Sequence, residues 1–190
     1  MNKYRARLII GYASFLIILT LLQFSIPDAL SYRGVKPDLL FVFAVLAGYL
    51  YGMTDAIVIG LLAGFIRDAY SGRFLGLGML LCLYCSILAV IFLKKILTRN
   101  IFLALLQVVF ATIIYHLSLA AISIIFFGVS IPIFEYITWV TKNRIFSSIL
   151  MNLAVAVILY FLLKMTGPYK KKVELFDEEG GSSGEAYENL

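Results

Sequence analysis

Long apolar segments follow one another along most of the chain, and only short polar stretches separate them. A helix needs about 20 apolar residues to cross the roughly 30 Å hydrocarbon core of a bilayer. Hydrophobic residues make up 62% of the chain and charged residues 14%, which is more apolar surface than a soluble domain of this length can bury. The sequence therefore predicts an all-α integral membrane protein whose solvent is the lipid bilayer.

Six segments have the length and hydropathy of membrane helices, and they predict a six-helix transmembrane bundle in a single domain, residues 1–167. The expected helices are 8–24, 38–51, 56–69, 76–93, 101–127 and 145–163. The second and third are short for full spans, and only GMTD, Gly52 to Asp55, separates them. Because GMTD is a weak helix breaker, one continuous helix over residues 38–69 is the alternative.

The basic residues indicate how the bundle is oriented. With six spans and the N-terminus inside, ten of the sixteen Lys and Arg residues lie on the inner side: Lys3, Arg5, Arg7, Lys94, Lys95, Arg99, Lys164, Lys170, Lys171 and Lys172. Cytoplasmic loops retain basic residues, so both termini are predicted in the cytoplasm. The net charge of +5 then reflects membrane topology, and no basic patch interleaved with aromatic residues points to nucleic acid.

Two segments outside the helices have compositions of their own. Residues 130–141, SIPIFEYITWVT, predict an interfacial segment at the outer leaflet, where Trp and Tyr are favoured. Residues 168–190 turn from basic to acidic to GGSSG, which predicts a disordered cytoplasmic tail. The end of the tail, Glu188 to Leu190, matches the start of a common engineered protease site, so we interpret part of the tail as an expression tag.

Small residues recur at intervals of four in the second and third segments. One stripe is formed by Ala44, Gly48 and Gly52, and the other by Ala56, Gly60, Gly64 and Asp68. Small residues at this spacing allow helix backbones to approach closely in lipid. We expect the two stripes to face each other in a tight hairpin, and a stripe that faces a partner helix or a ligand is the alternative.

The adjacent charges Arg67 and Asp68 end the third segment, before a glycine turn. Asp68 lies about 20 Å along the helix from Asp55, which places it near the outer interface. A carboxylate at mid-membrane would cost about 2.5–3.5 kcal/mol and would suggest an ion path, whereas the interface is less costly. We expect Asp68 to cap the following turn through backbone N–H groups, to pair with Arg67 or Arg73, or to contact a partner.

The remaining polar residues within the segments are sparse. Gln107, His116 and Asn152 are each expected to form hydrogen bonds between helices, because polar groups in lipid need partners. Cys82 and Cys85 are interpreted as packing residues, since four metal ligands cannot be assembled around them. The sequence contains no catalytic or phosphate-binding motif. We therefore expect that the protein is not an enzyme and that it has no cofactor.

The run from Lys36 to Leu80 resembles the signature region of the bacterial rod shape-determining protein MreD family. The residues that carry this resemblance are Pro37, Asp38, Gly48, Gly52, Gly60, Gly64, Asp68, Ser71, Gly72, Leu75 and Gly76. Their order and spacing over more than forty residues are fairly specific. The rest of the chain agrees with the family in length and hydropathy only.

The resemblance implies a multi-pass protein of the bacterial cytoplasmic membrane that belongs to the cell-elongation machinery. Members of the family associate with the bitopic protein MreC and work alongside MreB filaments, the glycosyltransferase RodA and its transpeptidase partner. Their helices are thought to resemble the S-components of energy-coupling-factor transporters. We therefore expect a non-enzymatic adaptor that supports peptidoglycan synthesis. Residues expected to pack helices or to contact the partner are Asp38, Gly48, Gly52, Gly60, Gly64, Asp68, Gly72 and Gly76.

The alternative function is that of a vitamin-binding S-component or a similar transporter subunit. Such a protein needs a polar and aromatic pocket that opens outward. The outer loops contain no concentrated polar cluster, and this argues against the transporter hypothesis.

Overall fold

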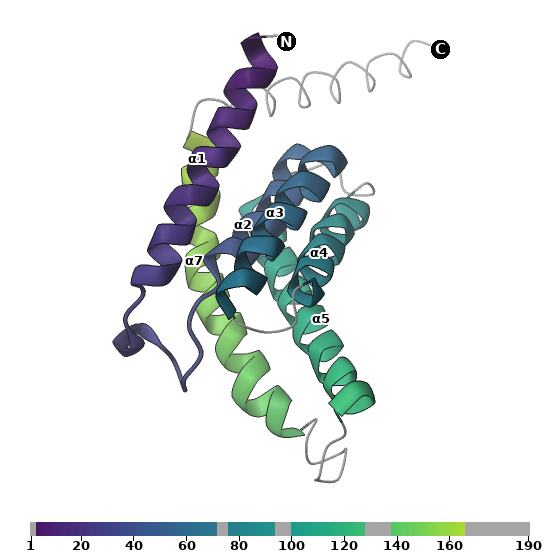
Figure 1. Cartoon of the computed structure of the whole chain (residues 1–190). Coiled ribbons are helices and arrows are strands. Elements are labelled where there is room, and N and C mark those ends of the chain that lie inside the picture. The colour runs from purple at the N-terminus through teal and green to yellow at the C-terminus, as the bar shows by residue number, and fades with distance from the viewer. Residues whose placement is uncertain (1–2, 72–75, 94–99, 128–137, 166–190) are drawn as a thin grey trace.

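The computed structural model describes residues 3–71, 76–93, 100–127 and 138–165, and this part of the chain forms an all-helical bundle (Figure 1). The six α-helices are α1 (Lys3–Ser25), α2 (Leu39–Tyr51), α3 (Met53–Ser71), α4 (Leu77–Leu93), α5 (Ile101–Phe127) and α7 (Phe146–Met165). A 3-10 turn, η1 (Asp28–Leu30), follows α1, and a π-helical turn, η2 (Thr141–Ile145), runs directly into α7. The predicted tail and most of the predicted interfacial segment lie outside the described residues.

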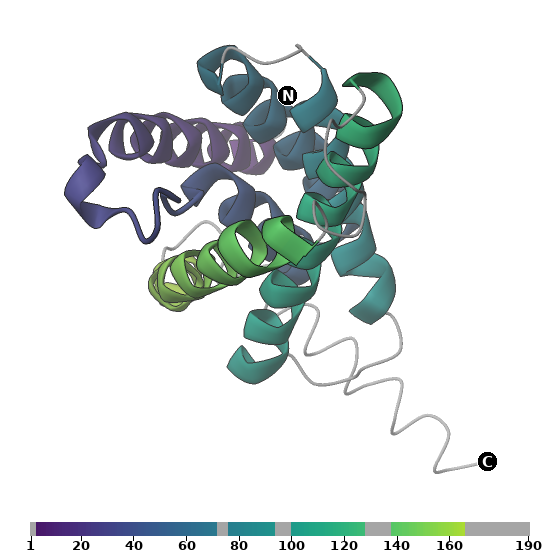
Figure 2. The same cartoon turned by 90° about the horizontal axis from the view of Figure 1, so that it is seen from below.

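Helix α2 lies at the centre of the bundle, between α1 and α7 in the view from below (Figure 2). It contacts α1, α3, α4, α5 and α7, and every residue from Leu40 to Tyr51 is buried. Its 13 residues extend only about 20 Å, which is less than the thickness of a hydrocarbon core. Because protein surrounds α2 on all sides, the helix does not need to match the thickness of a membrane.

The helices around α2 direct large apolar side chains outward. Ile125 and Phe126 on α5 are each 75% exposed, and α1 exposes Ile17 and Leu21. Among the described residues, two helices, 101–126 and 138–165, are long and apolar enough to cross a membrane, while α2 and parts of α1 and α4 are shorter apolar helices. An all-helical protein with apolar residues on its outer surface is typical of a membrane protein.

A single residue, Gly52, separates α2 from α3. Its φ of 98° lies in a region that favours glycine, and its N–H still donates to the carbonyl of Gly48, 3.3 Å away. The alternative of one continuous helix over residues 38–69 is therefore wrong. The expected GMTD loop is also shorter than predicted, because the N–H of Ala56 bonds to the carbonyl of Gly52 and makes residues 53–55 the first turn of α3.

The glycines of α2 and α3 lie where helix backbones approach most closely. A Cβ atom at Gly64 would lie 2.5 Å from Cα of Met79, and one at Gly48 would lie 2.6 Å from the carbonyl oxygen of Ser86. A Cβ atom at Gly60 would lie 3.1 Å from Cα of Leu83. The expectation that the two stripes face each other holds where Gly48 meets Ala56, but Gly60 and Gly64 face α4 instead.

Candidate functional site

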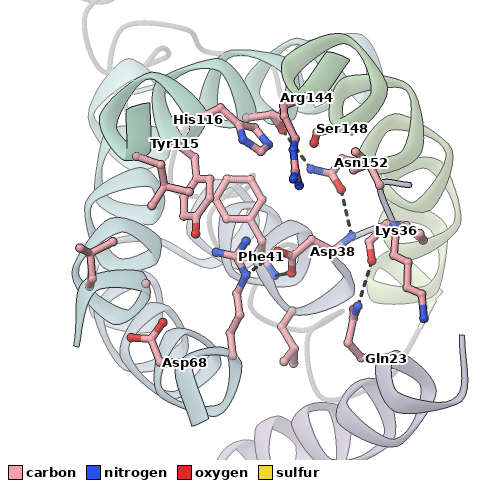
Figure 3. Close-up of a pocket in the computed structure, with 18 of the residues that line it drawn as sticks. Gln23, Lys36, Asp38, Phe41, Asp68, Tyr115, His116, Arg144, Ser148 and Asn152 are labelled. Carbon is pink, nitrogen blue, oxygen red and sulfur yellow. Dashed lines mark hydrogen bonds and ion pairs between the residues drawn. The ribbon is translucent and has the colours of Figure 1, made fainter. Parts of the chain in front are cut away.

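One end of the bundle encloses a cavity of about 860 Å³, between the ends of α1 and α3, the starts of α2, α4 and α7, and the second half of α5 (Figure 3). This volume is within the range of small-molecule binding sites. The polar and aromatic residues around it include Gln23, Lys36, Asp38, Arg67, Asp68, Tyr115, His116, Trp139, Arg144, Ser148 and Asn152. The polar cluster that the sequence analysis did not find is therefore present, assembled from α1, α3, α5 and α7, the segment that precedes α7, and the loop that precedes α2.

An ion pair between Asp38 and Arg67 occupies one wall of the cavity. Oδ2 of Asp38 lies 2.6 Å from Nε of Arg67, and these two side chains are 19% and 21% exposed. Oδ1 of Asp38 accepts a hydrogen bond from the backbone N–H of Phe41, 3.0 Å away, and so caps the start of α2. The guanidinium of Arg67 also lies 4.3 Å from the ring centroid of Tyr115, a cation–π contact. The pair thus connects α2, α3 and α5.

A chain of hydrogen bonds continues from Asp38 to the opposite side of the bundle. The backbone N–H of Asp38 donates to Oδ1 of Asn152, 3.0 Å away, and Nδ2 of Asn152 donates to the hydroxyl of Thr112 at 3.2 Å. The Thr112 hydroxyl in turn donates to the carbonyl of Val108. The prediction that Asn152 forms hydrogen bonds between helices is confirmed. For Gln107 it is not, because Nε2 of this buried side chain has no hydrogen-bond partner in the described part of the chain.

The loop between α1 and α2 is fastened to α1 beside the cavity. Gln23 donates from Nε2 to the carbonyl of Pro37 at 3.0 Å and accepts from the N–H of Leu39 at 2.8 Å. Nζ of Lys36 donates to the carbonyl of Ile26 at 2.9 Å. These bonds satisfy backbone groups at the start of α2 and fix the position of its cap, Asp38.

Asp68 binds the backbone at the start of α4. Its Oδ2 accepts hydrogen bonds from the N–H groups of Gly76 and Met79, at 2.9 and 3.0 Å, and the residue is only 4% exposed. Among the roles expected for Asp68, the structure shows capping of the turn that follows. Arg67 instead pairs with Asp38, and Arg73 lies outside the described residues.

We expect Asp68→Ala to lower the free energy of unfolding by about 2 kcal/mol, because it leaves two partly buried N–H groups without an acceptor. Asp68→Asn retains an oxygen acceptor and should cost less than half as much. Unfolding by SDS in mixed micelles, followed by circular dichroism, measures both values. Equal stability of the two variants would contradict the capping role.

The residues predicted from the sequence fall into two groups. Asp38 and Asp68 line the cavity, whereas Gly48, Gly60 and Gly64 lie at helix contacts. The turn residues Gly52 and Gly76 have φ values of 98° and 104°, and Gly72 lies outside the described residues. Sequence reasoning missed five residues at the cavity: Gln23, Lys36, Tyr115, Arg144 and Ser148. His116 was noted only as an isolated polar residue.

The apolar outer surface and the long apolar helices are typical of a helical membrane protein. Comparison with protein families supplies the particular family: the model of the rod shape-determining protein MreD matches residues 5–166, and the chain belongs to this family. Membership implies a role in determining rod shape. Comparisons with curated proteins and with solved structures find no significant match.

Proposed function

We propose that this protein is a non-enzymatic membrane adaptor of the bacterial elongation machinery. It spans the cytoplasmic membrane six times, keeps both termini in the cytoplasm and binds a bitopic protein of the MreC type. Through this complex it supports peptidoglycan synthesis by RodA and its transpeptidase partner, alongside MreB filaments. The observation that carries the proposal is the family match over residues 5–166.

The arrangement of the bundle supports an adaptor role. The glycines at the α2–α3 and α3–α4 contacts, the Asp38–Arg67 pair and the Asp68 cap hold helices of this chain together. In our proposal these residues contribute to the adaptor function indirectly, because they fix the positions of the helices on the outside of the bundle. The apolar side chains that α1, α5 and α7 direct outward then supply surfaces on which a single membrane helix can pack.

The proposal predicts that the full chain and an MreC-type partner form a stable complex in mild detergent. Both proteins are co-expressed, an affinity tag on the partner captures the complex, and size-exclusion chromatography with light scattering gives its mass. As a control, the partner's membrane helix is replaced by a polyleucine helix of equal length. If the chain is folded and monodisperse but elutes separately from the MreC-type partner as well as from its polyleucine variant, the proposal is wrong.

The cavity favours one second candidate, a substrate-binding subunit that resembles a transporter S-component. Its volume of about 860 Å³ and its polar and aromatic wall suit a small water-soluble ligand such as a vitamin. This candidate predicts tight vitamin binding by the purified chain alone and no association with the MreC-type partner. The co-elution experiment therefore separates the two functions.

A further inference from the structure

Most charges around the cavity are already matched within the chain. Asp38 pairs with Arg67, and Asp68 accepts two hydrogen bonds from the positive end of α4. Lys36, whose Nζ donates to the carbonyl of Ile26, also lines the wall, so the charged lining residues are three cations (Lys36, Arg67 and Arg144) and two carboxylates. Both carboxylates of the wall are therefore compensated, and the balance of charge around the cavity is positive.

Arg144 is a cation of the cavity wall that has no carboxylate partner among the described residues. Its contact within the described part of the chain is the ring of Trp139, 5.9 Å from the guanidinium carbon, and no described carboxylate lies within ion-pairing distance. Its side chain extends into the cavity between His116 and Asn152 (Figure 3). A guanidinium group presents paired N–H donors that match the oxygens of a phosphate or a carboxylate.

The local backbone places Arg144 in this position. The residue belongs to η2, a π-helical turn, and such turns are rare and frequently occur at functional sites. Lys142 lies in the same turn and is also exposed, but it does not line the cavity. Of the two basic residues in the turn, Arg144 therefore lines the cavity, and its side chain is itself exposed.

The wall of the cavity combines polar and apolar groups. Ser148 supplies a hydroxyl, while Leu119, Ile122 and Phe24 supply apolar surface. We propose that the cavity binds an amphiphilic anion, with its phosphate or carboxylate group at Arg144 and its apolar part against these side chains. The anion comes either from a membrane lipid or from a small soluble molecule. The proposal depends on the cavity alone and not on the partner complex.

The test measures binding to the full chain in a neutral detergent by native mass spectrometry and thermal shift. The probes are dimyristoyl phosphatidylglycerol, the zwitterionic phosphatidylcholine with the same chains, and decanoate. We expect saturable binding of one anionic probe per chain, at least tenfold tighter than phosphatidylcholine. Selectivity for phosphatidylglycerol assigns the site to a lipid, and selectivity for decanoate assigns it to a soluble anion; both results support the proposal.

Variants connect the binding to Arg144. Arg144→Gln should weaken binding of the anionic probe at least tenfold, Arg144→Lys should weaken it less, and the matched control Lys142→Gln should leave it unchanged. Unfolding midpoints without probe verify that each variant folds. If Arg144→Gln and Lys142→Gln bind the probe equally well, or if phosphatidylcholine binds as tightly as both anions, the proposal is wrong.

Discussion

Arg67→Met is expected to lower the free energy of unfolding by about 3 kcal/mol, because it leaves the charge of Asp38 without its partner. Breaking a buried ion pair by removing one member typically costs about 3–5 kcal/mol. The side chains of this pair are about one-fifth exposed, which favours the lower end of that range. SDS titration in mixed micelles, followed by circular dichroism, measures the loss.

A double-mutant cycle shows whether the loss arises from the pair itself. Asp38→Asn removes the charge but retains an oxygen that can accept from the N–H of Phe41, so α2 keeps its cap. The double variant Arg67→Met/Asp38→Asn has neither charge and should lose less stability than the two single losses combined. If the stability loss of the double variant equals the sum of the two single losses within about 0.5 kcal/mol, the two residues are not coupled.

Gly64→Leu is expected to cost about 3 kcal/mol or more, because the new side chain would enter the space occupied by the backbone of α4. Overpacking of a dense contact typically costs about 1–3 kcal/mol, and here even the first added atom would lie 2.5 Å from Cα of Met79. Replacing a glycine within a helix by a better helix-forming residue stabilises the helix by only about 1 kcal/mol. The steric cost therefore exceeds the gain, and the unfolding midpoint should fall sharply.

The matched control for this substitution is Ala69→Leu, at an exposed position on the same helix. It adds a similar side chain at an exposed site and should leave the midpoint nearly unchanged. Gly60→Ala should have an effect between the two, since its added atom would lie 3.1 Å from Leu83 and Ser86. If the Gly64→Leu and Ala69→Leu variants unfold at the same SDS midpoint, α3 and α4 do not pack as closely at Gly64 as the structure indicates.

Hydropathy and spacing predict the helical part of this fold well, because each helix has its own apolar run. Spacing also predicts that Gly60 and Gly64 share one face of a helix. It does not specify which neighbour meets that face, because a stripe of small residues fits any close-packed helix. The packing of α3 on α4 follows from the whole arrangement, in which α2 is enclosed on all sides.

The cavity could not be predicted in the same way. Its polar residues occur singly, in different helices, and each resembles an isolated hydrogen-bonding residue when its own segment is considered. Asp38 and Asn152 are 114 residues apart, yet they share a hydrogen bond. Their common depth in the bundle is the signal that connects them, and a comparison of the polar residues nearest the same end of the bundle in all the segments would have grouped them.

The central position of α2 has a consequence for the biosynthesis of the chain. The ribosome completes α2 early, but this short helix is enclosed only when α4, α5 and α7 have also been made. The backbone N–H of Asp38 meets its Asn152 partner only after 114 further residues have been translated. Nascent chains that stop before α7 therefore hold an incomplete bundle, in which the backbone N–H of Asp38 lacks its Asn152 acceptor.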